Sequence, residues 1–176
     1  MTGALRWLFF SFVVRLVTLL VMGLNVRGRT NLPRSGPAII VANHNSHLDT
    51  LILMSLMPLS LLPRLQPVAA LDYFMTKRAL AWFALNIIGI LPVNRAGGAN
   101  PLAMPRKALE EGQILILFPE GSRGAPEEMT EFKRGVALLL KECPHVPVIP
   151  VFMHGAGKAL PKGTRLGLPL RAGFDK

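Results

Sequence analysis

Five short apolar runs, separated by segments of helical period, are the feature of this sequence that most constrains its fold. Apolar runs of about four to eight residues, bounded by Gly, Pro or polar residues, are typical of buried strands. Buried strands that alternate with helices form a largely parallel or mixed sheet flanked by helices. The sequence therefore predicts an α/β domain with strands over Ala38–Ala42, Gln66–Leu71, Ile87–Val93, Gln113–Phe118 and Val146–Phe152, the last one buried.

The segments between these runs carry the helical pattern. Pro58 ends the first helix, and Gly112 is placed to cap the third. A short edge strand is also expected over Asn25–Gly28, ahead of the loop that leads into the first buried strand. The predicted helices cover Thr50–Met57, Tyr73–Leu85, Pro105–Glu111 and Phe132–Cys143.

A hydrophobic run of 18 residues, Trp7–Leu24, precedes the alternating region. At about 1.5 Å per residue, a helix of this length barely reaches the roughly 30 Å of a bilayer core. Ser11, Arg15 and Thr18 fall on one narrow stripe of such a helix, and apolar side chains cover the rest. We expect residues 1–24 to form a membrane helix sunk in one leaflet, with the polar stripe facing headgroups or the domain.

Two other roles compete for the same run. A secretory signal is disfavoured because no small-residue cleavage site follows and Arg15 interrupts the apolar region. A spanning helix stays open, with Arg27, Arg29 and Arg34 then marking the cytoplasmic side. A mid-span arginine is costly without a partner, which favours the helix within one leaflet.

The charge balance indicates an anionic partner. The net charge of +10 attracts nucleic acid or anionic lipid, and the 51% hydrophobic content favours lipid, since nucleic-acid binders normally need stacking aromatics and Tyr73 is the only tyrosine. The single Cys143 permits no internal disulfide, which is typical of a reducing compartment. We expect no nucleic acid partner, and a protein at the cytoplasmic face of the inner (plasma) membrane.

The polar cluster NHNSHLD, which follows the first buried strand, holds the candidate base. His44 and Asp49 lie five residues apart, about 140° around a helix, so they meet only if His44 is on the loop and Asp49 is in the first helical turn. Asp49 also completes a capping-box pattern with Ser46, and both roles stay open for it. A metal site from His44, His47, Cys143 and His145 matches no strong ligand spacing, and no metal is expected.

Two further strands end in candidate anion-binding residues. FPEGSRG (118–124) follows a buried strand, and its glycines permit a tight turn while Arg123 offers a fork that suits phosphate oxygens. GILPVNR (89–95) delivers Arg95 in the same way. Arg95 and Arg123, at strand ends expected to be neighbours, could clamp a phosphate. No phosphate-binding loop, dinucleotide fingerprint or nucleophile elbow is present.

NHNSHLD, GILPVNR, FPEGSRG and VPVIPV (146–151), in this order and spacing, resemble the four motif blocks of the glycerolipid acyltransferases. The resemblance covers roughly residues 25–152. It implies transfer of a fatty acyl group from acyl-CoA or acyl-ACP to a lipid hydroxyl, with 1-acyl-sn-glycerol-3-phosphate as the expected acceptor. It further implies that His44 is the catalytic base and Asp49 its orienting partner, and that acceptor binding falls to Arg95, Glu120, Gly121, Ser122, Arg123 and Lys133.

Other functions stay open where the sequence departs from the family. The family usually carries a lysine where VAALDYF (68–74) has Ala70, which leaves a different lysolipid or glycolipid as acceptor. The family also continues beyond VPVIPV, so the acyltransferase domain, residues 25–176, is expected to be abbreviated at its C-terminus. A non-catalytic protein that binds anionic lipid is the alternative outside enzymes. No cofactor is expected beyond the acyl donor.

Overall fold

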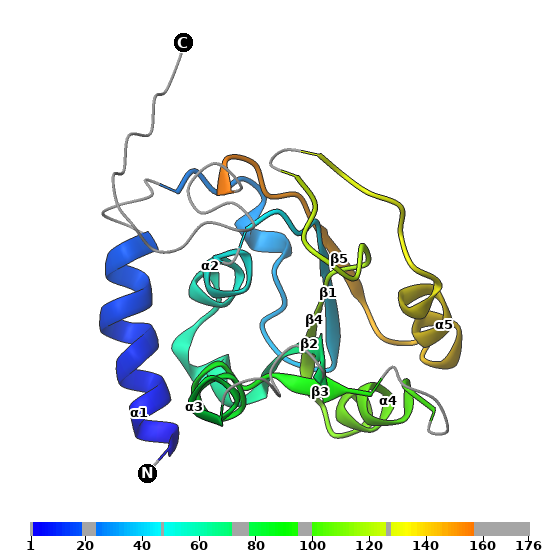
Figure 1. The fold of residues 1–176 in the computed structure, drawn as a ribbon, viewed down its shortest axis with the longest axis horizontal. Helices are drawn as coiled ribbons and strands as arrows, with labels where there is room; N and C mark the ends of the chain where they lie inside the picture. The colour runs from blue at the N-terminus through cyan, green and yellow to red at the C-terminus, as the bar shows by residue number, and fades with distance from the viewer. Residues whose placement is uncertain are drawn as a thin grey trace.

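A five-stranded sheet forms the centre of the protein (Figure 1). The computed structural model describes residues 2–18, 24–46, 48–71, 78–94, 100–125 and 128–156. The strands lie in the order β3-β2-β4-β1-β5, and all the pairs are parallel, which confirms the predicted α/β class. The strands are β1 (Ala38–Ala42), β2 (Leu65–Ala70), β3 (Leu91–Val93), β4 (Ile114–Leu117) and β5 (Val148–Val151).

Helices cover both faces of the sheet (Figure 1). Ile40 of β1 and Ile116 of β4 pack against α2 and the N-terminal helix, whereas Ile39 and Leu115 pack against α4 and α5. This alternation along each strand produces two apolar cores, one on each face. The helices are α1 (Thr2–Leu8), which continues as the π-type helix η1 (Phe9–Val14), η3 (Arg29–Asn31), α2 (Asp49–Leu56), η4 (Leu59–Arg64), α3 (Arg78–Phe83), which continues as η6 (Ala84–Ile88), α4 (Ala103–Glu110) and α5 (Arg134–Glu142).

The segment predicted as a strand over Ile87–Val93 is strand only in its last part. Ile87 and Ile88 end the helix η6, and Gly89 terminates it in the left-handed conformation with φ of +76°. Strand β3 begins at Leu91. The prediction was wrong for the first residues because a short buried apolar run has the same hydrophobic pattern in a helix as in a strand.

Two other predicted strands also differ. β5 was expected to be buried, but it lies at the end of the sheet beside β1, so Val148 and Pro150 are exposed. Residues 25–28 form no strand, and Gly28 there has φ of +66°. The first part of the predicted helix Tyr73–Leu85 lies outside the described residues, and its second part is confirmed from Arg78 onward.

The polar stripe of the N-terminal helix faces the domain. Arg15 Nη2 donates to the carbonyl oxygen of Met57 at 3.2 Å, and the buried Thr18 hydroxyl donates to the carbonyl oxygen of Val14 at 2.9 Å. No helix in the described ranges is long and apolar enough to cross a bilayer. The opposite side of the helix exposes large apolar side chains, namely Leu5, Leu8, Phe12, Val13, Leu16 and Val17.

Two adjacent leucines of α5 test the packing of this face. The side chain of Leu139 is 1% exposed in the core, and that of Leu138 is 51% exposed. We expect Leu139→Ala to lower the free energy of unfolding by about 2–5 kcal/mol because it leaves a cavity. Leu138→Ala is the matched control, with an expected change within about 0.5 kcal/mol. Equal midpoints for the two variants in urea unfolding would contradict the packing described.

Candidate active site

His44 and Asp49 meet at the carboxyl edge of the sheet. His44 lies two residues beyond β1, and Asp49 is the first residue of α2. The His44 Nδ1 and Asp49 Oδ2 atoms are 2.9 Å apart. The Asp49 side chain is 1% exposed and that of His44 is 19% exposed, so the carboxylate is enclosed while the histidine side chain is partly accessible. His44 thus lies on the loop and Asp49 in the first turn of α2, which is the arrangement that the sequence requires for the two side chains to meet.

The Asp49 carboxylate also organises the loop that carries His44. Its Oδ2 accepts the backbone N–H of Asn45 at 2.7 Å and that of Ser46 at 2.8 Å. The predicted capping box is not formed, because Leu48 is the N-cap of α2 and the Ser46 hydroxyl oxygen accepts the N–H of Leu48. Asp49 instead bonds the loop before the helix through the same oxygen that contacts His44. Because an ionised carboxylate can only accept, the His44 Nδ1 carries the proton and the Nε2 lone pair is left for a substrate.

The Phe118 ring stacks on one face of the His44 imidazole. The two rings stack with centroids 4.0 Å apart and an interplanar angle of 19°. This contact and the bond to Asp49 together define the plane and direction of the His44 ring. An aromatic face also favours a positive charge on the imidazole, because the face of the ring is negative.

Glu120 is buried and binds the backbone on both sides of the site. Its side chain is 2% exposed. Its Oε1 accepts the backbone N–H of His44 at 2.8 Å, and its Oε2 accepts the backbone N–H and the hydroxyl of Thr130 at 2.9 and 2.8 Å. The geometry gives this carboxylate a positioning task, since both oxygens are engaged within the protein.

Two buried asparagines of the NHNSHLD cluster, Asn43 and Asn45, bond other segments, a role not predicted from the sequence. Asn43 pairs with Met153 after β5, accepting its backbone N–H at 2.7 Å and donating to its carbonyl oxygen at 2.8 Å. Asn45 donates to the carbonyl oxygens of Ala125 and Glu128 at 2.6 and 2.8 Å. The sequence signal for these contacts is an asparagine on each side of the candidate base, because a buried amide needs hydrogen-bond partners from other segments.

The remaining predicted residues lie at different depths. The Gly124 N–H donates to the His44 carbonyl oxygen at 2.9 Å, which brings the neighbouring, half-buried Arg123 to the histidine loop. Gly121 turns the chain with φ of +71°, Ser122 is exposed, and Lys133 is exposed where α5 begins.

Arg95 lies outside the described residues, but the strand it follows is placed. The prediction that its strand neighbours that of Arg123 was wrong, because β2 lies between β3 and β4. Sequence order does not reveal this, because the strands of such a sheet need not lie in chain order. Within the described ranges, no group of three or more His, Cys, Asp or Glu is arranged to hold a metal ion.

Together these features define an α/β protein with a carboxylate-oriented histidine at the carboxyl edge of a parallel sheet. The sequence profile described as Acyltransferase matches residues 23–154. The chain belongs to this acyltransferase family.

Named relatives and a solved structure agree with this membership. The chain is 30% identical to the chloroplastic 1-acyl-sn-glycerol-3-phosphate acyltransferase LPAT1 of Arabidopsis thaliana, over 80% of this chain and 38% of that one. It is 30% identical to 1-acyl-sn-glycerol-3-phosphate acyltransferase alpha of Homo sapiens, over 73% and 44%. The chain thus spans about two fifths of the length of these relatives. The crystal structure of the 1-acyl-sn-glycerophosphate (LPA) acyltransferase PlsC from Thermotoga maritima shares the fold, with a TM-score of 0.64, 20% identity, and coverage of 93% of this chain and 80% of that one.

Glu120→Gln tests the positioning task. Glutamine has the same shape as glutamate, but its NH2 group would face the backbone N–H of either His44 or Thr130. Two donors cannot bond each other, so one hydrogen bond is lost. We expect the free energy of unfolding to fall by about 1–3 kcal/mol in urea titrations. Glu128→Gln, at an exposed position of the same loop, is the control and should unfold as the wild type does. An unchanged stability of Glu120→Gln would show that its carboxylate does not hold the two segments together.

Proposed function

We propose that this protein is a lysophospholipid O-acyltransferase that moves a fatty acyl group from acyl-CoA or acyl-ACP to 1-acyl-sn-glycerol-3-phosphate, giving phosphatidic acid. The observation that carries the proposal is the 2.9 Å contact between His44 Nδ1 and the buried Asp49 carboxylate. Support for the substrate class comes from the family and from the printed names of the relatives.

In the proposed reaction, His44 Nε2 removes the proton of the acceptor hydroxyl as its oxygen attacks the thioester carbonyl carbon. Asp49 stabilises the imidazolium that forms, and Phe118 supports it through its ring face. The tetrahedral intermediate then collapses with cleavage of the C–S bond. His44 returns its proton to the departing thiolate, so the free thiol and the ester leave together. A thioester is already activated, so no nucleophilic side chain is needed.

Acceptor binding is proposed for the segments that border His44. Arg95 and Arg123 would hold the phosphate from two sides. Their strands are separated by one strand, about 10 Å apart in a sheet, a gap that two long guanidinium side chains can close around one anion. Gly121 and Ser122 would form the turn beside it, Glu120 would keep the loop in place, and Lys133 would add positive charge.

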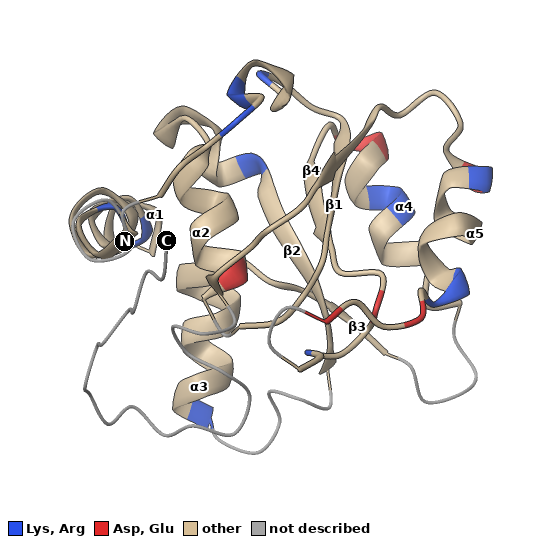
Figure 2. Ribbon diagram, turned by 90° about the horizontal axis from the view of Figure 1, so that it is seen from above, with Lys and Arg blue, Asp and Glu red and all other residues tan. Residues whose placement is uncertain are grey.

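Membrane attachment is proposed for the exposed apolar side of the N-terminal helix. Leu5, Leu8, Phe12 and Leu16 follow helical spacing and form one continuous stripe. Lys and Arg residues occur on α3, α4, α5 and the segment before β1, so attraction to anionic lipid is spread over the molecule (Figure 2). The stripe would sink into one leaflet of the inner membrane at its cytoplasmic face, where acceptor and product reside.

Thiol release from acyl-CoA in the presence of a lysolipid panel tests the reaction. We expect the wild type to release thiol with 1-acyl-sn-glycerol-3-phosphate and His44→Ala to be about 10²–10⁴-fold slower, because the base is lost. His145→Ala is the control, since His145 is exposed in the turn between α5 and β5, whereas His44 follows the end of β1. If no acceptor supports thiol release, the enzyme proposal is wrong and a lipid-binding protein is favoured. If another lysolipid or a glycolipid is preferred, the proposed acceptor is wrong, an alternative that Ala70 leaves open because the family usually has a lysine there.

In the same assay, Asp49→Asn distinguishes whether Asp49 orients the His44 ring or only holds the loop before α2. The variant keeps an oxygen for the backbone N–H groups but no longer favours the correct tautomer of His44. We expect kcat to fall at least about tenfold with KM for the acceptor little changed. A variant that loses melting temperature but retains kcat would assign Asp49 to holding this loop alone.

Sedimentation with lipid vesicles tests the membrane attachment. The double substitution Phe12→Ser and Leu16→Ser removes two exposed apolar side chains from the stripe. We expect the partition coefficient to fall about tenfold or more, because this apolar area no longer enters the leaflet. Leu138→Ser, which is equally exposed but lies on α5, should sediment as the wild type does. Unchanged sedimentation of the double variant would contradict attachment through this stripe.

A further inference from the structure

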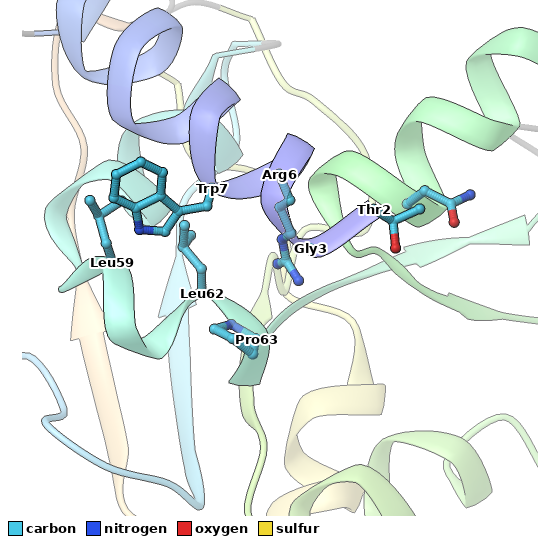
Figure 3. Close-up of a pocket in the computed structure, with 8 residues that line it drawn as sticks. Thr2, Gly3, Arg6, Trp7, Leu59, Leu62 and Pro63 are labelled. Carbon is cyan, nitrogen blue, oxygen red and sulfur yellow. The ribbon is translucent and has the colours of Figure 1, made fainter.

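A cavity of about 290 Å³ lies beside the N-terminal helix (Figure 3). Its apolar lining includes Trp7, Leu59 and Leu62. Its polar lining comprises Thr2, Arg6 and Asn86. A cavity with an apolar wall and a few convergent polar groups has the composition of a ligand site.

This cavity is remote from the catalytic pair. Arg6, which lines it, contacts the carbonyl oxygen of Leu65 at the first residue of β2. Leu65 and Ala38 both pair with Ile114, so Leu65 is level with the beginning of β1, whereas His44 follows its end. At about 3.3 Å per residue, the two places are roughly 15–20 Å apart along the strands. A ligand in the cavity would therefore not occupy the acyl-transfer site.

Arg6 brings a positive charge to the cavity without a counter-ion. Its Nη2 donates to the carbonyl oxygens of Leu65 at 2.9 Å and Ile88 at 3.0 Å. Its Nε is buried and has no hydrogen-bond partner, and the ion pairs of the described residues do not include Arg6. Burial lowers the pKa of the Arg6 guanidinium, although an arginine stays protonated in proteins. A partly desolvated guanidinium of this kind is stabilised by an oxyanion.

The local backbone holds the guanidinium in place. A Cβ on Gly89 would lie 2.6 Å from Arg6 Nη2, so a glycine is what permits the approach. The two carbonyl oxygens restrain the side chain but supply only partial negative charge. Arg6 is thus preorganised, and its remaining N–H groups still lack an acceptor within the described part of the chain.

We propose that this cavity binds the phosphate head group of an anionic phospholipid, with Arg6 as the partner of the phosphate. The volume suits a head group, while the exposed Leu5, Trp7 and Leu8 on the same helix offer an apolar surface to the acyl chains. The assignment to a lipid rests on the membrane attachment proposed above. The binding itself requires neither His44 nor an acyl donor, so it can be tested independently of the transfer reaction.

Tryptophan fluorescence tests the proposal, because Trp7 lines the cavity. With Trp82→Phe as background, dihexanoyl phosphatidylglycerol is titrated below its micelle-forming concentration. We expect saturable binding that Arg6→Gln weakens about tenfold or more, through loss of a charge-assisted contact. Zwitterionic dihexanoyl phosphatidylcholine carries the same phosphate, but its choline ammonium brings a second positive charge to Arg6, so it should bind at least about tenfold more weakly than phosphatidylglycerol. His44→Ala should bind as the background does.

A cavity-filling variant keeps the test independent of folding. A Cβ on Gly3 would meet no atom within 4 Å, and Gly3 lines the cavity, so we expect Gly3→Leu to occupy part of the cavity volume. Gly135→Leu on α5, where a Cβ is equally unhindered, is the matched control. Gly3→Leu should lose binding at an unchanged melting temperature. Wild-type binding by both Gly3→Leu and Arg6→Gln, or equal binding of the two lipids, would overturn the proposal. Inorganic phosphate that binds as tightly as phosphatidylglycerol would overturn the lipid assignment in favour of a free anion.

Discussion

The site depends on the parallel pairing of β1 between β4 and β5. Because these strands point the same way, the residues that follow them meet at one edge of the sheet: His44 after β1, Phe118 and Glu120 after β4, and Met153 after β5. Side chains then join the three strand ends, since Asn43 bonds Met153 and Glu120 bonds the His44 N–H. A slip of one residue in this register would turn every side chain of β1 to the opposite face of the sheet and separate these groups.

Two buried carboxylates make this junction rigid. Asp49 and Glu120 accept backbone N–H groups from segments that have no regular structure of their own. Both oxygens of Glu120 and the Oδ2 atom of Asp49 are bonded in this way, so each carboxylate stabilises the particular loop conformation that supplies its donors. The His44 ring is consequently held in one orientation by contacts within the protein.

The N-terminal helix has two different sides. Phe10 and Val14 belong to the same core as Ile40 and Leu53, and Arg6 and Arg15 bond carbonyl oxygens of the domain. Its opposite side presents an apolar stripe to the surroundings. Polar residues that would be expensive inside a membrane thus serve as contacts to the domain, and this resolves why an arginine stands within an otherwise apolar run.

The sequence by itself determined the α/β class and four of the five strands to within about one residue at most boundaries, because these follow from local hydrophobic period. The spacing of His44 and Asp49 allowed their pairing but left the role of Asp49 open, and only the family resemblance implied the pair. The sequence pattern misjudged Ile87–Ile88, whose apolar pattern suits a helix as well as a strand, and the exposure of β5, which depends on strand order. Only the tertiary structure decided that Glu120 holds His44 and Thr130, that β2 separates β3 from β4, and that Arg6 reaches Leu65 and Ile88. These contacts join residues far apart in the chain, and local sequence carries no information about which distant segments meet.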